Sequence, residues 1–356
     1  MLISVILAFF GGVLATCIGA LGSVILCAFV ALAGVCAQWA GCEYPIVLGI
    51  AFGYFLSPHL GLGPAACALG YAKKRGWVED SKGIGLPLMM LGKPSVLIVG
   101  GIFAVLSYFI NVGLATVLPG KIDSISLSIV VIGIIAKLLF GNEGLFGKVP
   151  EGDTRFGVNS TNNWMPHMPF GNGIYYWFFA GSAGIISTYI FWEISEYAKE
   201  TNNPGLAQVA IFPMFALAVI FLILLVCGLP CPVFHHVGLT SCYAGMMAYG
   251  AGQGELVILL WGAAFGIVSH FVADWLADVF LVYGDGYVDP PSLSMAACSV
   301  FTWIVFPALG LYNGTVGIVT PVVMLVLTGV LAIVVQQKRN ASIAAQAAAA
   351  AEGAAA

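Results

Sequence analysis

Long apolar stretches interrupted by very few charges constrain this chain more than any other feature. Of its 356 residues, 60% are hydrophobic and only 8% are Asp, Glu, Lys or Arg, and the mean hydropathy is +1.01. A soluble domain carries about 25% charged residues, because its surface needs polar cover. Lipid must therefore be the solvent for much of this surface, and we predict an all-α, polytopic transmembrane helical bundle.

Breaks at Gly, Pro and charged clusters divide the chain into about 10–12 membrane segments. A helix needs about 20 apolar residues to cross the hydrocarbon core. The expected segments are 2–20, 21–37, 45–57, 60–72, 95–118, 123–140, 172–195, 203–228, 232–249, 254–283, 289–312 and 315–336. Segments 45–57 and 60–72 are too short to cross alone, so they form either a re-entrant hairpin or one broken span.

These segments form two membrane halves, residues 1–140 and 172–336. A Gly-, Asn- and Pro-rich polar loop, 141–171, lies between them, and an Ala-rich, low-complexity tail, 337–356, follows; we expect that tail to be disordered or loosely helical. We place the N-terminus in the cytoplasm and count all twelve segments as crossings; a hairpin of 45–57 and 60–72 that never crosses gives the same sides. All Lys and Arg residues except Lys121 and Lys199 then fall on the cytoplasmic side. Because positive charge collects there, we expect a cell (inner) membrane protein with both termini and the loop in the cytoplasm.

Three short matches recur in the same order in both halves. The sequence His59-Leu-Gly-Leu pairs with His236-Val-Gly-Leu, residues 107–117 pair with 269–279, and residues 122–128 pair with 288–294. These matches predict repeats of about 21–140 and 172–312. The matched segments are five apart, and an odd shift turns the second copy upside down. Inverted repeats with interrupted helices are typical of secondary transporters, which bind their substrates between the repeats.

Three motifs add a weak resemblance to known sequences. Pro58-His59-Leu-Gly-Leu, Phe140-Gly-Asn-Glu-Gly-Leu-Phe-Gly and Val288-Asp289-Pro-Pro resemble stretches of uncharacterised bacterial multi-pass membrane proteins labelled as permeases. The resemblance covers scattered motifs only. It implies a membrane protein and does not imply a substrate.

The sharpest cluster of ionisable residues is His270, Asp274 and Asp278. Their i, i+4, i+8 spacing places them on one face of a helix. Ionisable groups inside the membrane are costly, so they usually face an interior or a water path and carry function. Two nearby carboxylates favour sharing a proton or a cation. The plainer interpretation is that Asp278 meets water at the helix end and His270 is a hydrogen-bonded core residue.

Four further residues stand where helices begin. Asp123 and Asp289 each precede an apolar run, either as plain N-caps or as ion ligands at broken helices. His59 and His236 begin Gly-rich segments, where free N–H groups would suit an anion, or they are interfacial residues at turns. His235 adjoins His236, but neighbouring helix residues face different ways. We therefore expect no metal site and no other cofactor.

These features favour a secondary transporter for a small polar solute, such as an organic anion, coupled to H⁺ or Na⁺. No Walker A motif is present, so this chain is not expected to hydrolyse ATP or to be an enzyme. Two alternatives stay open: an intramembrane, metal-dependent lipid-modifying enzyme, and a non-catalytic membrane subunit of a complex. The expected partners are the lipid bilayer, the solute or ion, and a second copy in a homo-oligomer. Without a basic patch, no nucleic acid is expected.

Overall fold

The structure, a computed structural model, describes residues 1–152, 154–156 and 173–355, and every regular element within them is a helix. The main helices are α1 (Leu2–Ile18), α2 (Ala20–Trp39), α3 (Leu62–Lys74), α4 (Pro94–Val117), α5 (Ser124–Phe140), α6 (Gly173–Glu200), α7 (Pro204–Val209), α8 (Phe212–Ile220), α9 (Ile223–Val226), α10 (His235–Gly250), α11 (Glu255–Ala277), α12 (Pro290–Val300), α13 (Phe306–Ala308) and α14 (Gly314–Ala355). Three short π-helices, η1 (Val47–Ala51), η3 (Asp278–Val282) and η4 (Phe301–Val305), and one 3₁₀-helix, η2 (Leu88–Leu91), join or extend them.

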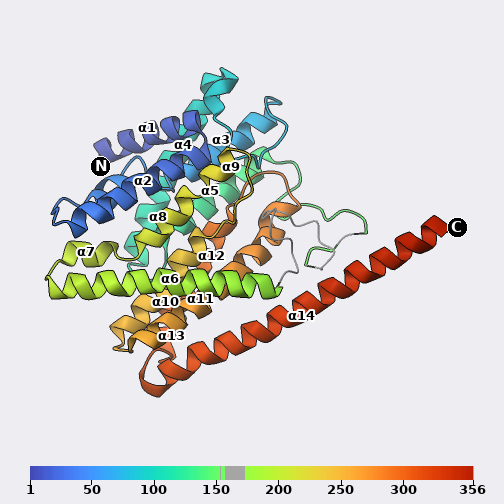
Figure 1. Ribbon diagram of the computed structural model, residues 1–356. Helices are drawn as coiled ribbons and strands as arrows, with labels where there is room; N and C mark the ends of the chain where they lie inside the picture. The colour runs from blue at the N-terminus through green and yellow to red at the C-terminus, as the bar shows by residue number, and fades with distance from the viewer. Residues whose placement is uncertain (153, 157–172, 356) are drawn as a thin grey trace.

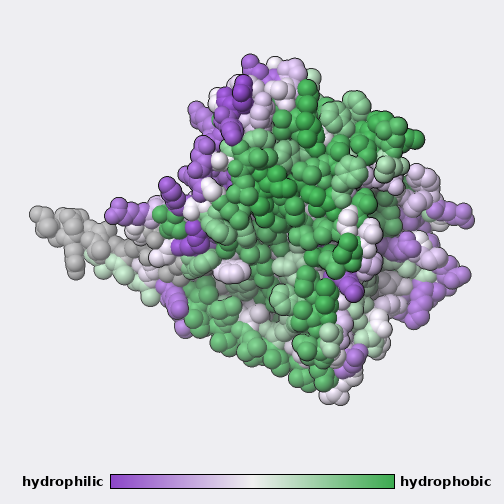
Figure 2. Space-filling view, turned by 180° about the vertical axis from the view of Figure 1, so that it is seen from behind, coloured by the Kyte–Doolittle hydropathy of each residue, from purple (hydrophilic) through white to green (hydrophobic). Residues whose placement is uncertain are grey.

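Six of the described helical stretches are long and apolar enough to cross a membrane. They are Ala20–Trp39, Pro94–Val117, Gly173–Glu200, Glu255–Val282, Pro290–Ala308 and Gly314–Ala345. Three shorter apolar stretches accompany them, namely Leu2–Ile18, Ser124–Phe140 and Phe212–Val226. Apolar residues cover the middle of the face seen in Figure 2, while hydrophilic residues gather towards its left and right sides. The expected polytopic helical bundle is confirmed.

Small residues set the packing of the first half. Helix α1 packs against α4 where Gly12 and Thr16 meet Gly100 and Ala104. A Cβ added to Gly100 would collide with Thr16 Oγ1, and one added to Gly12 would lie 2.6 Å from Gly100 O. Thr16 itself donates to Gly12 O at 2.7 Å. In lipid, where helix association depends on close van der Waals contact, such small faces hold helices together.

The second half repeats this packing. Helix α6 packs against α11, and a Cβ on Gly262 would collide with Thr188 Oγ1, while one on Gly184 would collide with Gly262 O. Helices α3 and α10 each pack on the corresponding pair and on α5 and α12 respectively. By these contacts α1–α5 correspond to α6–α13. The repeat defined by packing therefore begins at α1, earlier than the residue 21 expected from the sequence matches.

The two copies run in opposite directions. Gln38, at the end of α2, donates from Nε2 to Gly205 O at the start of α7 at 3.0 Å, whereas Leu21, at the start of α2, lines a cavity with Leu225 of α9. Helix α2 is thus antiparallel to its own counterpart, as an inverted repeat requires. The last helix, α14, has no counterpart and packs on α6 and α11.

The pair α5 and α12 shows the same inversion. Asp123 N donates to Ser299 Oγ at 2.9 Å, and a Cβ on Gly133 would lie 3.2 Å from Tyr287 O. The start of α5 therefore meets the last turn of α12, and the start of α12 meets the middle of α5. Since α5 continues from Gly133 to Phe140, at 1.5 Å per residue the start of α12 lies about 10 Å inside the bundle.

Residues 45–74 cross the bundle once as a broken span. Gly34 of α2 lies against Val47, and Ser23 near the other end of α2 lies against Gly61, after which α3 continues beside α5. Pro58 and Pro64 flank this interruption, where proline suits a helix break or a first turn. The choice left open by the sequence is settled in favour of a single crossing.

A single crossing here changes the relation of the two termini. The turn at Gly19 lies against residues 85–86, at the end of the bundle that carries Lys73, Lys82 and Lys137. Met1 is therefore at the opposite end from the C-terminal part of α14, and Figure 1 shows N and C on opposite sides. The expectation that both termini share one side is wrong, because it assumed two crossings or none between residues 45 and 72.

The Ala-rich tail is helical throughout its described part. Helix α14 runs unbroken to Ala355, and its end extends beyond the bundle in Figure 1. Alanine has the highest intrinsic helix propensity, which accounts for a helix that few contacts support. Residue 153 and residues 157–171 of the expected polar loop lie outside the described residues.

Candidate functional site

Two cavities lie between the repeats. The first, of about 380 Å³, is lined by Lys82, Leu222 and Tyr287 among others, and we name it the Lys82 cavity. The second, of about 240 Å³, is lined by Phe52, Tyr243 and Trp303 among others, and we name it the Trp303 cavity. Four residues line both cavities, namely Val24, Leu62, His235 and Asp289. These four residues thus mark where the two cavities approach each other.

Asp289 caps α12 and faces both cavities. Its Oδ2 accepts from Ser292 N at 2.9 Å and from Ser292 Oγ at 2.5 Å. Its Oδ1 accepts from the Tyr287 hydroxyl at 2.8 Å. All three partners can donate, which is what an ionised, acceptor-only carboxylate needs. Asp289 is only 4% exposed, so the helix N-terminus and these donors stabilise its charge away from bulk water.

Asp123 repeats this geometry at the start of α5. Its Oδ1 accepts from Ser126 N at 3.0 Å, and its Oδ2 accepts from Ser126 Oγ at 2.5 Å. Here the third donor is the Tyr243 hydroxyl, 2.8 Å from Oδ2. Asp123 lines the Trp303 cavity only. Both carboxylates are therefore N-caps, as the plainer sequence interpretation held, and both also face a cavity.

Helix α10 begins inside the bundle without a side-chain cap on its first turn. His235, its first residue, is 8% exposed, and its Nδ1 is buried with no hydrogen-bond partner among the described residues. Leu239 and Tyr243 follow at four-residue intervals and also line the Trp303 cavity. A helix N-terminus, an imidazole and a phenol thus share one face towards the cavity.

The predicted histidines His59 and His236 lie behind this face. His59 Nδ1 and Ser57 Oγ are 2.8 Å apart in a buried hydrogen bond. His236 is fully buried and stacks on His270, with ring centroids 5.8 Å apart and planes 13° apart. Neither histidine lines either cavity. The structure places His235, rather than its neighbour His236, at the repeat interface.

The α11 residues His270, Asp274 and Asp278 are buried but lie elsewhere. The ring of His270 meets Tyr176 of α6 edge-on at 4.5 Å. Asp274 lines a hollow with Tyr176 and Leu331, between α6, α11 and α14. Asp278 begins the turn η3. His270 thus faces α6 and α10, and Asp274 faces α6 and α14. None of the three residues lines the two cavities between the repeats.

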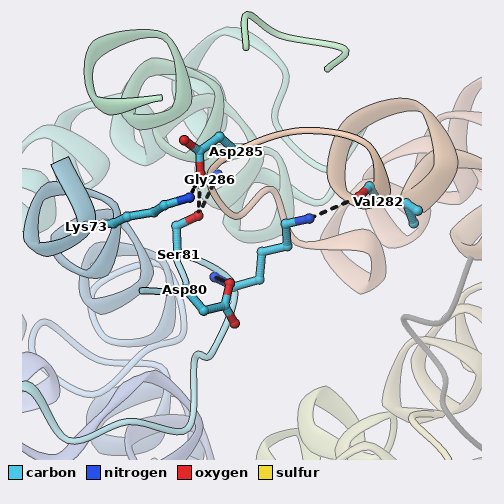
Figure 3. Close-up of polar contacts among 7 residues, drawn as sticks. Lys73, Asp80, Ser81, Val282, Asp285 and Gly286 are labelled. Carbon is cyan, nitrogen blue, oxygen red and sulfur yellow. Dashed lines mark hydrogen bonds and ion pairs between the residues drawn. The ribbon is translucent and has the colours of Figure 1, made fainter. Parts of the chain in front are cut away.

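Basic residues gather at the end of the bundle near the Lys82 cavity. Figure 3 shows Lys73 and Ser81 directed at Asp285 in the loop after η3, at 2.5 Å and 3.0 Å from Oδ1. Burial alone would raise the pKa of Asp285, but the hydrogen bonds from Lys73 and Ser81 lower it, and the net shift is downwards. This ion pair joins α3 of the first repeat to a loop of the second.

Carbonyl oxygens of η3, which continues α11 without a break, accept hydrogen bonds from three more cations. Lys82 Nζ donates to Val282 O at 3.0 Å, Lys137 Nζ to Phe280 O at 2.5 Å, and Arg155 to Asp278 O at 2.8 Å. The last carbonyls of a helix lack intrahelical partners and carry partial negative charge. Positive residues therefore stabilise the end of α11. Burial lowers the pKa of Lys82 more than its acidic neighbours raise it.

Several residues of the site escaped the sequence analysis, although some signals were present. His235, Leu239 and Tyr243 are spaced for one helix face, and Ser292, Met295 and Trp303 follow the same rule on α12 and η4. Tyr287 stands two residues before Asp289. Nothing in the sequence pairs Tyr243 with Asp123. Within the described residues, no group of three or more His, Cys, Asp and Glu residues could hold a metal ion.

Comparison with known proteins gives a family and no activity. No curated protein and no solved structure matches this chain. One family model, described as a family of unknown function (DUF7973), matches residues 1–159 and 205–322. The match covers most of both repeats, including α5, α10 and α12, which form the cavities. Since it spans more than half of the chain, the protein belongs to the DUF7973 family.

Proposed function

We propose that this protein is a secondary transporter in which a small polar solute crosses between the two repeats, through the Lys82 and Trp303 cavities. The observation that carries the proposal is that one imidazole and one carboxylate, His235 and Asp289, line both cavities. Solute sites of transporters with inverted repeats lie at the repeat interface, where helices are interrupted. Here α3, α10 and α12 all begin inside the bundle.

The arrangement also provides for alternating access and coupling. Two inverted copies meeting around one site can open it to either side by rocking. His235, Asp123 and Asp289 are the groups that can exchange a proton or Na⁺ with the solute path, and His270, Asp274 and Asp278 of α11 are a second candidate set. By the positive-inside rule, we assign the Lys-rich end, with Lys73 and Lys82, to the cytoplasmic side of the inner membrane. Met1, at the opposite end of the bundle, then lies outside.

Accessibility of the shared residues tests the proposal without a known solute. Val24 lines both cavities, whereas Val96 is also buried and lines neither. Each is replaced by cysteine in a background without native cysteines. We expect a membrane-impermeant thiol reagent to modify Val24→Cys from either side of a vesicle and to leave Val96→Cys unmodified. Modification from one side only, under every ion gradient tried, would contradict alternating access.

Flux is the second test. Hits from a thermal-shift screen of small solutes are loaded into proteoliposomes, and counterflow is measured for the wild type, for Leu62→Trp, which fills the place where the cavities approach, and for the surface control Asp80→Asn. We expect counterflow in the wild type and the control and none in Leu62→Trp. Chemical conversion of a hit without movement would favour the enzyme alternative and overturn transport.

A further inference from the structure

The Trp303 cavity has a wall of aromatic rings. Phe52 and Phe212 have ring centroids 4.6 Å apart, and Tyr243 and Trp303 have centroids 4.5 Å apart. Phe215 lies 6.0 Å from Phe52, and all five rings line the cavity. The faces of such rings carry negative potential and attract cations, most strongly when water is excluded.

The fixed charges of this cavity have one sign. Asp123 and Asp289 both line it, and no Lys or Arg is among its described lining residues. Lys82 lines the other cavity, where its Nζ donates to a carbonyl. In a low-dielectric interior, two carboxylates facing one space favour a positive guest strongly over a negative one.

Each carboxylate retains room for a further contact. Oδ1 of Asp123 accepts only from Ser126 N, and Oδ1 of Asp289 accepts only from the Tyr287 hydroxyl, among the contacts of the described residues. A carboxylate oxygen has two lone-pair positions. The protein donors hold both carboxylates in place and leave one acceptor position on each for a ligand.

Two buried nitrogen atoms among the described lining residues lack a hydrogen-bond partner that a ligand could provide. Trp303 Nε1 and His235 Nδ1 are buried and have no hydrogen-bond partner in the described part of the chain. An indole N–H can only donate, so an acceptor oxygen on a ligand that reaches Trp303 Nε1 would satisfy it. A buried donor without an acceptor costs about 1–3 kcal/mol, and a bound hydroxyl or carbonyl oxygen would remove this cost.

We propose that the Trp303 cavity binds an organic ammonium ion that also carries a hydroxyl or carbonyl oxygen. The cationic head lies against the aromatic rings and near Asp123 and Asp289, and the oxygen accepts from Trp303 Nε1. Movement of this ligand across the membrane rests on the proposed transport function, whereas its binding is argued from the cavity alone. It replaces the organic anion anticipated from the helix starts at His59 and His236, because neither histidine lines this cavity, whereas two carboxylates do.

The test compares three probes of similar shape on purified protein in nanodiscs by isothermal titration calorimetry. Choline has both the charge and the oxygen, tetramethylammonium has only the charge, and 3,3-dimethyl-1-butanol has only the oxygen. We expect choline to bind most tightly, tetramethylammonium less tightly, and the neutral alcohol at least about tenfold more weakly than choline. Equal affinity of choline and the alcohol, or no binding of either ammonium ion, would overturn the assignment.

Variants locate the binding. Trp303→Leu and Asp123→Asn should each weaken choline binding about tenfold, and Trp303→Phe should restore the ring contact but not the preference for choline over tetramethylammonium. The matched control, Trp39→Leu, removes a half-exposed tryptophan that packs on Tyr197 outside the cavity and should bind as the wild type does. If Asp123→Asn does not fold, the tryptophan series and the probe series still decide. Choline binding that is unchanged in Trp303→Leu would refute the site.

Binding and flux fail separately. Choline that binds in the Trp303 cavity but never crosses proteoliposomes would remove the transport proposal and leave this site intact. Counterflow of some other solute, blocked by Leu62→Trp, together with no ammonium binding, would keep transport and overturn the ligand class.

Discussion

The close contact of α6 with α11 offers the sharpest test of the fold. Replacing Gly262 by alanine puts a methyl group against Thr188, whose Cβ would be 2.6 Å away, and 2.9 Å from Gly184 O. Real Cβ atoms do not approach other heavy atoms so closely, so the two helices must separate. Overpacking of this kind costs about 1–3 kcal/mol.

The effect should be visible as a lower apparent melting temperature. In chains of 150–250 residues, 1 kcal/mol corresponds to about 2–4 °C, and less in longer chains. We therefore expect Gly262→Ala to melt about 2–6 °C below the wild type by intrinsic fluorescence in one detergent at one scan rate. The matched control is Gly113→Ala, in the interior of α4 with open space around it. It should melt at or slightly above the wild type, because alanine is the better helix former by about 0.5–1 kcal/mol.

A size exchange separates packing from other causes. Thr188→Gly with Gly262→Ala returns the space that the added methyl group needs, so the double variant should recover part of the loss. Gly100→Ala, in the first repeat, should fall by a comparable amount, since Thr16 stands where Thr188 does. A Gly262→Ala variant that melts at or above the wild type would refute the reasoning about this contact.

Three further outcomes are expected. Reporter fusions at the N-terminus and after Arg339 should lie on opposite sides of the membrane, with the second cytoplasmic; reporters on the same side would contradict the single crossing between residues 45 and 74. Removing the partly exposed ion pair by Lys73→Met should lower the free energy of unfolding by about 0.2–1 kcal/mol. Because folding lowers the pKa of Asp285 from 3.8, the ion pair stabilises the protein above that pH, and this stabilisation is lost as the pH falls through the lower folded pKa. Melting temperatures of wild type and variant that differ as much at pH 3 as at pH 7 would argue against this ion pair. In proteoliposomes, Asp289→Asn should abolish counterflow, whereas Asp274→Asn should affect only its dependence on H⁺ or Na⁺; normal counterflow in Asp289→Asn would move the site to α11.

The sequence predicted the helices well because their signals are local. A run of apolar residues needs lipid or a core wherever it lies, and Gly, Pro and capping Asp residues end or begin helices by their own backbone chemistry. Asp123 and Asp289 were recognised as helix starts for this reason, and the expected boundaries of α5 and of the helical stretch Pro290–Ala308 lie within a few residues of those observed. The recurring motifs likewise placed α3, α4 and α5 opposite α10, α11 and α12.

The sequence could not determine which buried polar residues face one another. His270, Asp274 and Asp278 have the stronger local signal, since ionisable residues inside an apolar helix are rare, yet none of them lines the two cavities: His270 packs against α6 and α10, and Asp274 lies by α6 and α14. His235 has the weaker signal and faces the cavities, because the rotation of α10 is set by its contacts with α6 and α11. Rotation about a helix axis depends on all the neighbours of that helix, which no single segment encodes.

The side of the membrane on which a terminus lies was also a tertiary property. Composition and apolar runs determined by themselves that the chain is a helical membrane protein, and three ordered sequence matches predicted its two related halves. Whether residues 45–72 cross once, twice or not at all depended on how Val47 and Gly61 pack along α2, and the N-terminus changes sides with that answer. Only the packed structure brought Asp123, Asp289, His235 and Trp303 around shared cavities, because these residues come from segments of both repeats that meet only when the inverted copies dock.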